Sequence, residues 1–172
     1  MKSATLPYFG KVDFSKSNEI YVEKTFQNKL IQFDIHFQNA KEAQMETVKT
    51  FLDNLSEKAK MAMAAIKDDY SGAQKGEYPN QSKDYIDHHA DVFEAADLEI
   101  LLKNTDKTLS VHDQLFSLVH LHRVGFYVGF AVSAPVLVVL DHKISANGVT
   151  TDYLIVVSMD ELGEVKSIDM ES

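Results

Sequence analysis

The stretch Ile31-Gln32-Phe33-Asp34-Ile35-His36-Phe37 decides the fold class, because apolar and polar residues alternate along it without interruption. A period of two predicts a strand that has one apolar face and one polar face. The preceding residues 20–26 are rich in Tyr, Val, Thr and Phe and predict a second strand. Turn-forming residues 27–29 separate the two, so we expect a hairpin, with a shorter strand over residues 8–14 before it.

After this hairpin the spacing of the apolar residues becomes helical. Residues 40–69 contain no Pro or Gly, and their apolar side chains recur at intervals of three and four. This spacing predicts one amphipathic helix. Asn39 and Glu42 have the spacing of a capping box at its start. A loop is expected over residues 71–82, where Gly and Pro interrupt the pattern.

The rest of the chain predicts further helices and then strands. Ser82 is positioned to cap a second helix over residues 83–93, and shorter helical segments are expected at 97–103 and 111–119. Four apolar or alternating segments predict the later strands, at residues 123–130, 136–140, 153–159 and 165–171. This order predicts one α+β domain over residues 1–172. We expect an antiparallel sheet built from an N-terminal and a C-terminal strand set, with two to four helices between them packed on one face.

The composition narrows the classes of function. The 172 residues carry 26 acidic and 17 basic side chains, a formal net charge of −9, and no Cys. The lack of Cys excludes disulfides, thiol nucleophiles and Cys-ligated zinc. The negative charge disfavours nucleic acid and anionic membrane surfaces as partners. The sequence shows no apolar stretch typical of a signal peptide or a membrane helix, so we expect a cytoplasmic protein.

Several segments together are similar to a known bacterial family. These segments are Tyr8-Phe9-Gly10-Lys11-Val12-Asp13-Phe14, Asp84-Tyr85-Ile86-Asp87-His88-His89, Arg123-Val124-Gly125-Phe126-Tyr127, Val139-Leu140-Asp141-His142-Lys143-Ile144, Thr151-Asp152-Tyr153-Leu154-Ile155-Val156-Val157 and Ile168-Asp169-Met170-Glu171-Ser172. Their order resembles the bacterial family of domains of unknown function numbered two-thousand-and-four. The resemblance implies a small bacterial α+β protein and supplies no catalytic residues. By analogy, related small acidic bacterial domains suggest an immunity protein against a toxin.

His120 and His122 are the candidate metal ligands. If the residue between them lies in a strand, both imidazoles project to the same side of it. A third ligand, His112 or His142, would then complete a site for a divalent metal such as zinc. A solvated strand face explains the same spacing without a metal. The triplet Asp87-His88-His89 is a weaker candidate, because neighbouring helical residues point about 100° apart.

Acidic residues cluster in and after the expected second helix. Residues 84–99 carry six acids and no Lys or Arg, and residues 159–172 carry five acids and one Lys. Clustered negative charge speeds association with a basic protein, so we expect such a partner. The alternative is that these charges serve solubility alone. The candidate partner-binding residues are Asp84, Asp87, Asp91 and Glu94.

The sequence lacks the motifs of common catalytic sites. It contains no nucleophile elbow, phosphate-binding loop or dinucleotide fingerprint. It therefore favours a non-catalytic interaction module of immunity or regulatory type, without a cofactor. Two alternatives stay open, namely a metal-dependent enzyme with a His-rich site and a small-molecule binder. A homodimer is a common state for domains of this size.

Overall fold

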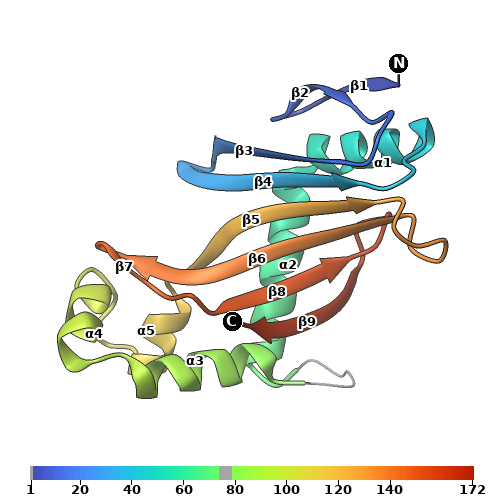
Figure 1. Ribbon diagram of the computed structural model, residues 1–172. Helices are drawn as coiled ribbons and strands as arrows, with labels where there is room; N and C mark the ends of the chain where they lie inside the picture. The colour runs from blue at the N-terminus through green and yellow to red at the C-terminus, as the bar shows by residue number, and fades with distance from the viewer. Residues whose placement is uncertain (1, 74–78) are drawn as a thin grey trace.

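The computed structural model describes residues 2–73 and 79–172. In chain order its elements are β1 (Ser3–Leu6), β2 (Gly10–Asp13), β3 (Asn18–Phe26), β4 (Lys29–Phe37), α1 (Glu42–Asp53), α2 (Leu55–Tyr70), α3 (Gln81–Val92), α4 (Ala95–Leu102), α5 (Val111–Phe116), β5 (Val119–Val128), β6 (Val136–Ala146), β7 (Val149–Thr150), β8 (Leu154–Met159) and β9 (Val165–Glu171). Strands occupy both ends of the chain and helices occupy its middle (Figure 1), which confirms the α+β class.

The main sheet joins the N-terminal and C-terminal strands in the order β3-β4-β5-β6-β8-β9, with β7 paired to β6. Neighbouring strands are antiparallel, as predicted, except for β4 and β5, which are parallel. The prediction of a wholly antiparallel sheet is therefore wrong at this one junction. Between these strands the chain passes through all five helices, and a long crossover of this kind lets β5 run in the same direction as β4 (Figure 1).

The described residues form five helices rather than two to four, partly because the helix predicted over residues 40–69 is two helices. Asn54 has φ −108° and ψ 18°, outside helical values, and its side chain donates a hydrogen bond to the Thr50 carbonyl at 2.8 Å. This side-chain bond satisfies a carbonyl at the end of α1 and lets α2 start in a new direction. Both helices still bury one stripe of apolar residues, as the spacing predicts.

The predicted capping box at the start of α1 is wrong. Asn39 lies before the helix with φ 56°, and the N-cap position is Lys41. The Lys41 backbone N–H donates to Gln44 Oε1 at 2.8 Å, so a Gln three residues on performs the role expected of Glu42.

The start of α3 also differs from the prediction that Ser82 caps it. The helix begins at Gln81, and Ser82 is buried inside its first turn. The carboxylate of Asp69 accepts the backbone N–H of Asn80 at 2.7 Å and that of Ser82 at 2.6 Å. A negative charge satisfies these free N–H groups better than a hydroxyl would. Part of the loop predicted over 71–82, residues 74–78, lies outside the described residues.

At the N-terminus, the strand predicted over residues 8–14 is instead the second half of a hairpin. β1 and β2 pair with each other, and the chain turns at Tyr8, which has φ 67°. The Tyr8 ring stacks on Phe33 with ring centres 4.4 Å apart, so this hairpin packs onto the end of the core.

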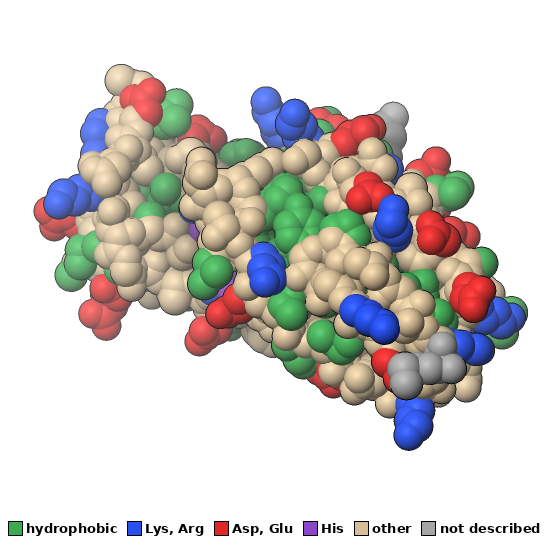
Figure 2. All heavy atoms as spheres, turned by 90° about the horizontal axis from the view of Figure 1, so that it is seen from above, with side chains coloured by type: hydrophobic (Ala, Val, Ile, Leu, Met, Phe, Trp, Pro, Cys, Tyr) green, Lys and Arg blue, Asp and Glu red, His purple; other side chains and the backbone are tan. Residues whose placement is uncertain are grey.

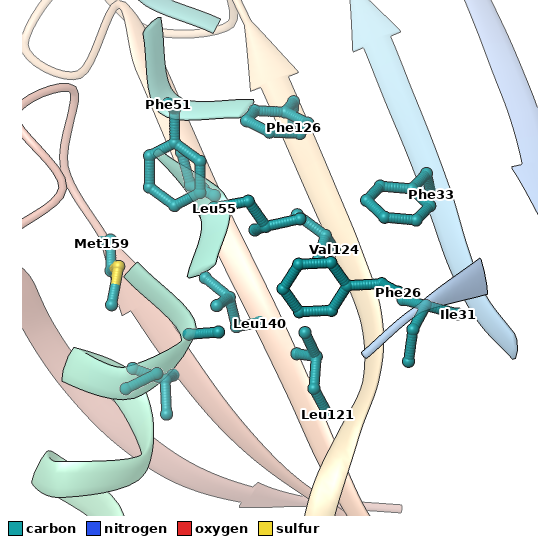
Figure 3. Close-up of a cluster of buried hydrophobic side chains, with 14 of the residues drawn as sticks. Phe26, Ile31, Phe33, Phe51, Leu55, Leu121, Val124, Phe126, Leu140 and Met159 are labelled. Carbon is teal, nitrogen blue, oxygen red and sulfur yellow. The ribbon is translucent and has the colours of Figure 1, made fainter. Parts of the chain in front are cut away.

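The hydrophobic core lies between the helices and one face of the sheet. Figure 3 shows Phe126 and Val124 of β5 directed toward Phe51 and Leu55, and the rings of Phe51 and Phe126 meet edge to face at 5.6 Å. Buried side chains from all five helices belong to this single cluster. Within the described residues, no helix combines the length and apolar character needed to cross a membrane.

Candidate functional site

The opposite face of the main sheet has no helix packed on it in the described part of the chain. Val139 and Val156 are buried there at 8% and 5% exposure, yet neither belongs to the core cluster. Strand register places the alternate residues of six strands on this side, which we call the open face. Its members include Glu19, Tyr21, Glu23, Leu30, Gln32, Asp34, His36, His120, Arg123, Tyr127, Leu137, Val139, Asp141, Lys143, Leu154, Val156, Ser158, Ser167, Asp169 and Glu171.

An ion cluster lies at the centre of the open face. The Arg123 guanidinium of β5 donates to both oxygens of Asp34 on β4, at 2.6 and 2.8 Å. It also donates to Asp141 Oδ2 on β6 at 2.9 Å and to the Tyr127 hydroxyl at 3.1 Å. Asp34 and Asp141 are 0% and 2% exposed. Two buried carboxylates therefore share one cation, and the three groups together carry an excess negative charge.

Asp141 is incompletely satisfied in this cluster. Its second oxygen, Oδ1, is buried and has no hydrogen-bond partner among the described residues. Burial raises the pKa of the Asp141 carboxyl, and its contacts with Arg123 oppose that rise only in part. A buried acceptor without a donor is costly and uncommon in native proteins, so it marks a place where an additional donor would stabilise the structure.

A histidine extends the cluster toward the edge of the sheet. His36 Nε2 lies 2.8 Å from Asp34 Oδ2, and its Nδ1 lies 3.7 Å from Glu19 of β3. Its ring stacks on Tyr127 with ring centres 4.7 Å apart and an interplanar angle of 6°. Polar groups on four adjacent strands are thus held in one row.

Apolar side chains lie beside this row and acidic ones surround it. Tyr127, Leu137, Val139, Leu154 and Val156 form a strip across β5, β6 and β8. The open face has six acidic side chains, Glu19, Glu23, Asp34, Asp141, Asp169 and Glu171, and two basic ones, Arg123 and Lys143. The open face thus combines a central ion cluster, an adjacent apolar strip and acidic side chains on its edge strands, and protein–protein interfaces likewise combine apolar and charged groups.

The acidic residues predicted to bind a partner lie elsewhere. Asp84, Asp87 and Asp91 are on α3, whereas Glu94 precedes α4. Asp87 forms an ion pair with Lys83, and its Oδ1 lies 3.5 Å from His112 Nε2. These contacts compensate part of the negative charge of Asp87. The face seen from above has acidic and basic side chains interspersed around an apolar patch (Figure 2).

The candidate metal ligands lie at the start of β5. A register shift between Leu121 and Arg123 places His122 in a bulge, which interrupts the alternation expected to align the two imidazoles. Burial lowers the pKa of His120 and of His122. The positive charges of Lys29 and Lys143 lower the pKa of His120 further, and Lys143 also lowers that of His122. Within the described residues, no three His, Asp or Glu side chains gather as a metal site requires. Metal binding stays a prediction, and the neighbouring cations disfavour it.

The triplet Asp87-His88-His89 has a structural explanation. His89 Nδ1 lies 2.6 Å from the Tyr85 carbonyl one helical turn back, and its Nε2 lies 2.6 Å from Thr151 Oγ1. This buried ring joins α3 to the segment before β8, so its two nitrogens are already engaged.

The buried His89 predicts a pH dependence of stability. Burial lowers the pKa of His89 below its ordinary 6.5. The unfolded chain therefore binds a proton near pH 6.5 that the folded protein binds only at lower pH. We expect His89 to contribute up to about 1.4 kcal/mol per pH unit to the fall in the free energy of unfolding below about pH 6.5, in addition to the contributions of His120, His122 and His142, whose pKa values burial also lowers. Urea unfolding between pH 7 and the onset of carboxylate titration measures this slope, and His89→Gln should reduce it. An equal slope in both proteins would contradict the assignment.

Sequence reasoning missed the open face because its members are far apart in the chain. A signal was nevertheless present: Arg123 is the one arginine of the sequence, and it lies within an apolar strand. Asp34 and Asp141 likewise interrupt or end apolar segments. Charged residues at such positions need partners, but the identity of those partners depends on strand order.

Comparison with protein-family models, curated proteins and solved structures finds no match for this chain. The resemblance to the bacterial family of unknown function stays a prediction. Geometry and charge are therefore the available guides to function.

Proposed function

We propose that this protein is a non-catalytic interaction module whose open face binds a basic segment of another protein. The observation that carries the proposal is a sheet face that no described helix covers. The accessible carboxylates of Glu19, Glu23, Asp169 and Glu171 lie on its two edge strands, and Tyr127, Leu137 and Leu154 are partly exposed between them. Buried apolar contact supplies affinity in such an interface, while complementary charge selects the partner and speeds encounter.

Charge also separates the candidate occupants of the open face. A second copy of this chain would bring two acidic faces together, and like charges across an interface oppose association. Nucleic acid is disfavoured by the same sign of charge. A basic partner avoids both kinds of repulsion, since its cationic side chains can neutralise the carboxylates on the edge strands of the open face.

A matched pair of charge reversals tests this surface against the one expected from the sequence. Asp169→Lys with Glu171→Lys alters the rim of the open face, whereas Asp87→Lys with Asp91→Lys alters α3 by the same net charge. The probe is a short amphipathic peptide of leucine and arginine, titrated into the full chain by calorimetry. We expect the first pair to weaken binding by about tenfold or more and the second by less than about twofold.

Nuclear magnetic resonance with the same peptide gives an independent location. Amide shifts should concentrate on β5, β6 and β8, and a peptide in which glutamate replaces arginine should not bind. Shifts confined to α3, or equal losses from the two pairs of reversals, would contradict the open-face proposal. So would dimerisation of the isolated protein through this face.

A further inference from the structure

A cavity of about 310 Å³ lies at the end of the sheet where β4 and β5 separate. The two strands pair only along Gln32–Phe37 and Arg123–Val128, so their earlier residues are not joined. The bulge at His122 bends β5 away from β4 at this point. Side chains of α2 form another wall of the cavity. We call this space the β4–β5 pocket.

The walls of the β4–β5 pocket are largely apolar. Phe26, Ile31 and Leu121 line it and also belong to the edge of the core (Figure 3). Met63 of α2 contributes a flexible apolar surface on the other side. A pocket of this size with apolar walls and a few polar groups is typical of sites for small ligands. It would remove the apolar body of a ligand from water.

The charged groups that line the pocket are all cationic. Lys29 and Lys60 lie in its lining, and no Asp or Glu does so among the described residues. Lys143 lies opposite His120 in the pairing of β5 with β6, on the open face and outside the lining. The chain as a whole has a net charge of −9, so this local sign is opposite to the average. At physiological salt, screening weakens electrostatic interactions beyond about 8 Å. The lysines close to the pocket therefore determine its electrostatic potential.

Two histidines provide polar groups inside the lining. His120 Nδ1 lies 3.0 Å from the Leu118 carbonyl, and its Nε2 lies 3.2 Å from Ser145 Oγ. His142, which is 1% exposed, is held by the Leu140 carbonyl at 3.2 Å. These contacts engage both nitrogens of His120 and one nitrogen of His142, so they hold the two rings as rigid walls of the pocket before any ligand arrives.

We infer that the β4–β5 pocket binds a small free organic acid with an apolar body. The acid group lies at Lys29 and Lys60, where charge favours an anion, and the body lies against Phe26, Ile31 and Leu121. This site has the opposite charge to the open face, and the residues proposed to hold the ligand, Lys29, Lys60, Phe26, Ile31 and Leu121, are not among the open-face residues. It therefore stands or fails independently of the proposed protein partner.

Calorimetric titration of the full chain with octanoate tests this inference. Octylammonium, which has the same chain length and the opposite charge, is the matched ligand control. We expect octanoate to bind about tenfold or more tightly than octylammonium. Equal affinities would show that the pocket selects only for apolar surface, and no binding of octanoate would show that the pocket is not a site. Either result would overturn the inference.

Charge reversals locate the binding in the pocket. Lys29→Glu with Lys60→Glu should weaken octanoate binding by about tenfold or more. Lys16→Glu with Lys67→Glu changes the net charge equally outside the lining and should weaken it by less than about twofold. All four lysines are exposed, so the variants should fold, and thermal unfolding verifies this. Equal weakening by both pairs would overturn the location.

A filling variant and a vesicle control complete the test. Ala59→Leu adds volume within the lining from α2 and should reduce octanoate binding while α-helical content is retained. Phosphatidylglycerol vesicles should not co-sediment with the protein. Co-sedimentation that the Lys29 and Lys60 reversals abolish would assign the pocket to a lipid headgroup and overturn the inference of a free acid.

Discussion

Replacing Arg123 with Leu is expected to lower the free energy of unfolding by about 3–5 kcal/mol. The substitution leaves the carboxylates of Asp34 and Asp141 buried, close together and without their shared cation. Removing one partner of a buried ion cluster costs far more than removing the whole cluster, because the remaining charges keep their desolvation penalty. Urea unfolding at neutral pH, analysed by linear extrapolation, measures the loss.

A neutral version of the cluster is the control for this prediction. Arg123→Leu combined with Asp34→Asn and Asp141→Asn removes all three charges together. We expect this triple variant to regain a large part of the lost stability, since no buried charge is left unpaired. If Arg123→Leu alone costs less than about 1 kcal/mol, the carboxylates are not held as the structure shows. The result would then weaken the open-face proposal as well.

Replacing Phe126 with Ala is expected to cost about 3–5 kcal/mol of unfolding free energy. Phe126 is 0% exposed and meets Phe51 of α1 edge to face, so its ring connects the sheet to the first helix. Its removal leaves a cavity that surrounding side chains fill only in part, and the lost contacts add to the lost burial.

Phe130 gives a matched comparison four residues further along. Its side chain is 51% exposed, beyond the end of β5. Phe130→Ala should change the free energy of unfolding by less than about 0.5 kcal/mol. Equal losses from the two substitutions would mean that β5 does not present Phe126 to the core. The same urea experiment measures both variants.

Period and composition were sufficient to predict the type of nearly every element. The alternation of residues 31–37 predicts β4 with its apolar face inward, and the structure confirms both points. The helical spacing of residues 40–69 predicts the buried stripe of α1 and α2, although the break at Asn54 was missed. The helical spacing of apolar residues continues through Asn54. A single side chain that ends a helix does not change this spacing, so the pattern does not show the break.

The ends of elements were harder to predict, because distant residues decide them. The start of α3 depends on Asp69, whose carboxylate accepts two backbone N–H groups 11 and 13 residues further along the chain. A local search for a capping residue selects Ser82, which the structure places inside the first turn. Caps supplied by another element become visible only when the two elements are placed side by side.

The sequence by itself determined the fold class, because the spacing of apolar residues in each strand and helix shows which face is buried. It also determined the net charge of −9 and the presence of one arginine among apolar residues. The tertiary structure alone decided that β4 and β5 are neighbours and parallel. That pairing brings Arg123 between Asp34 and Asp141, and the separation of the same two strands opens the pocket near His120. Both candidate sites depend on contacts between distant residues, and local periodicity carries no information about which strands pair.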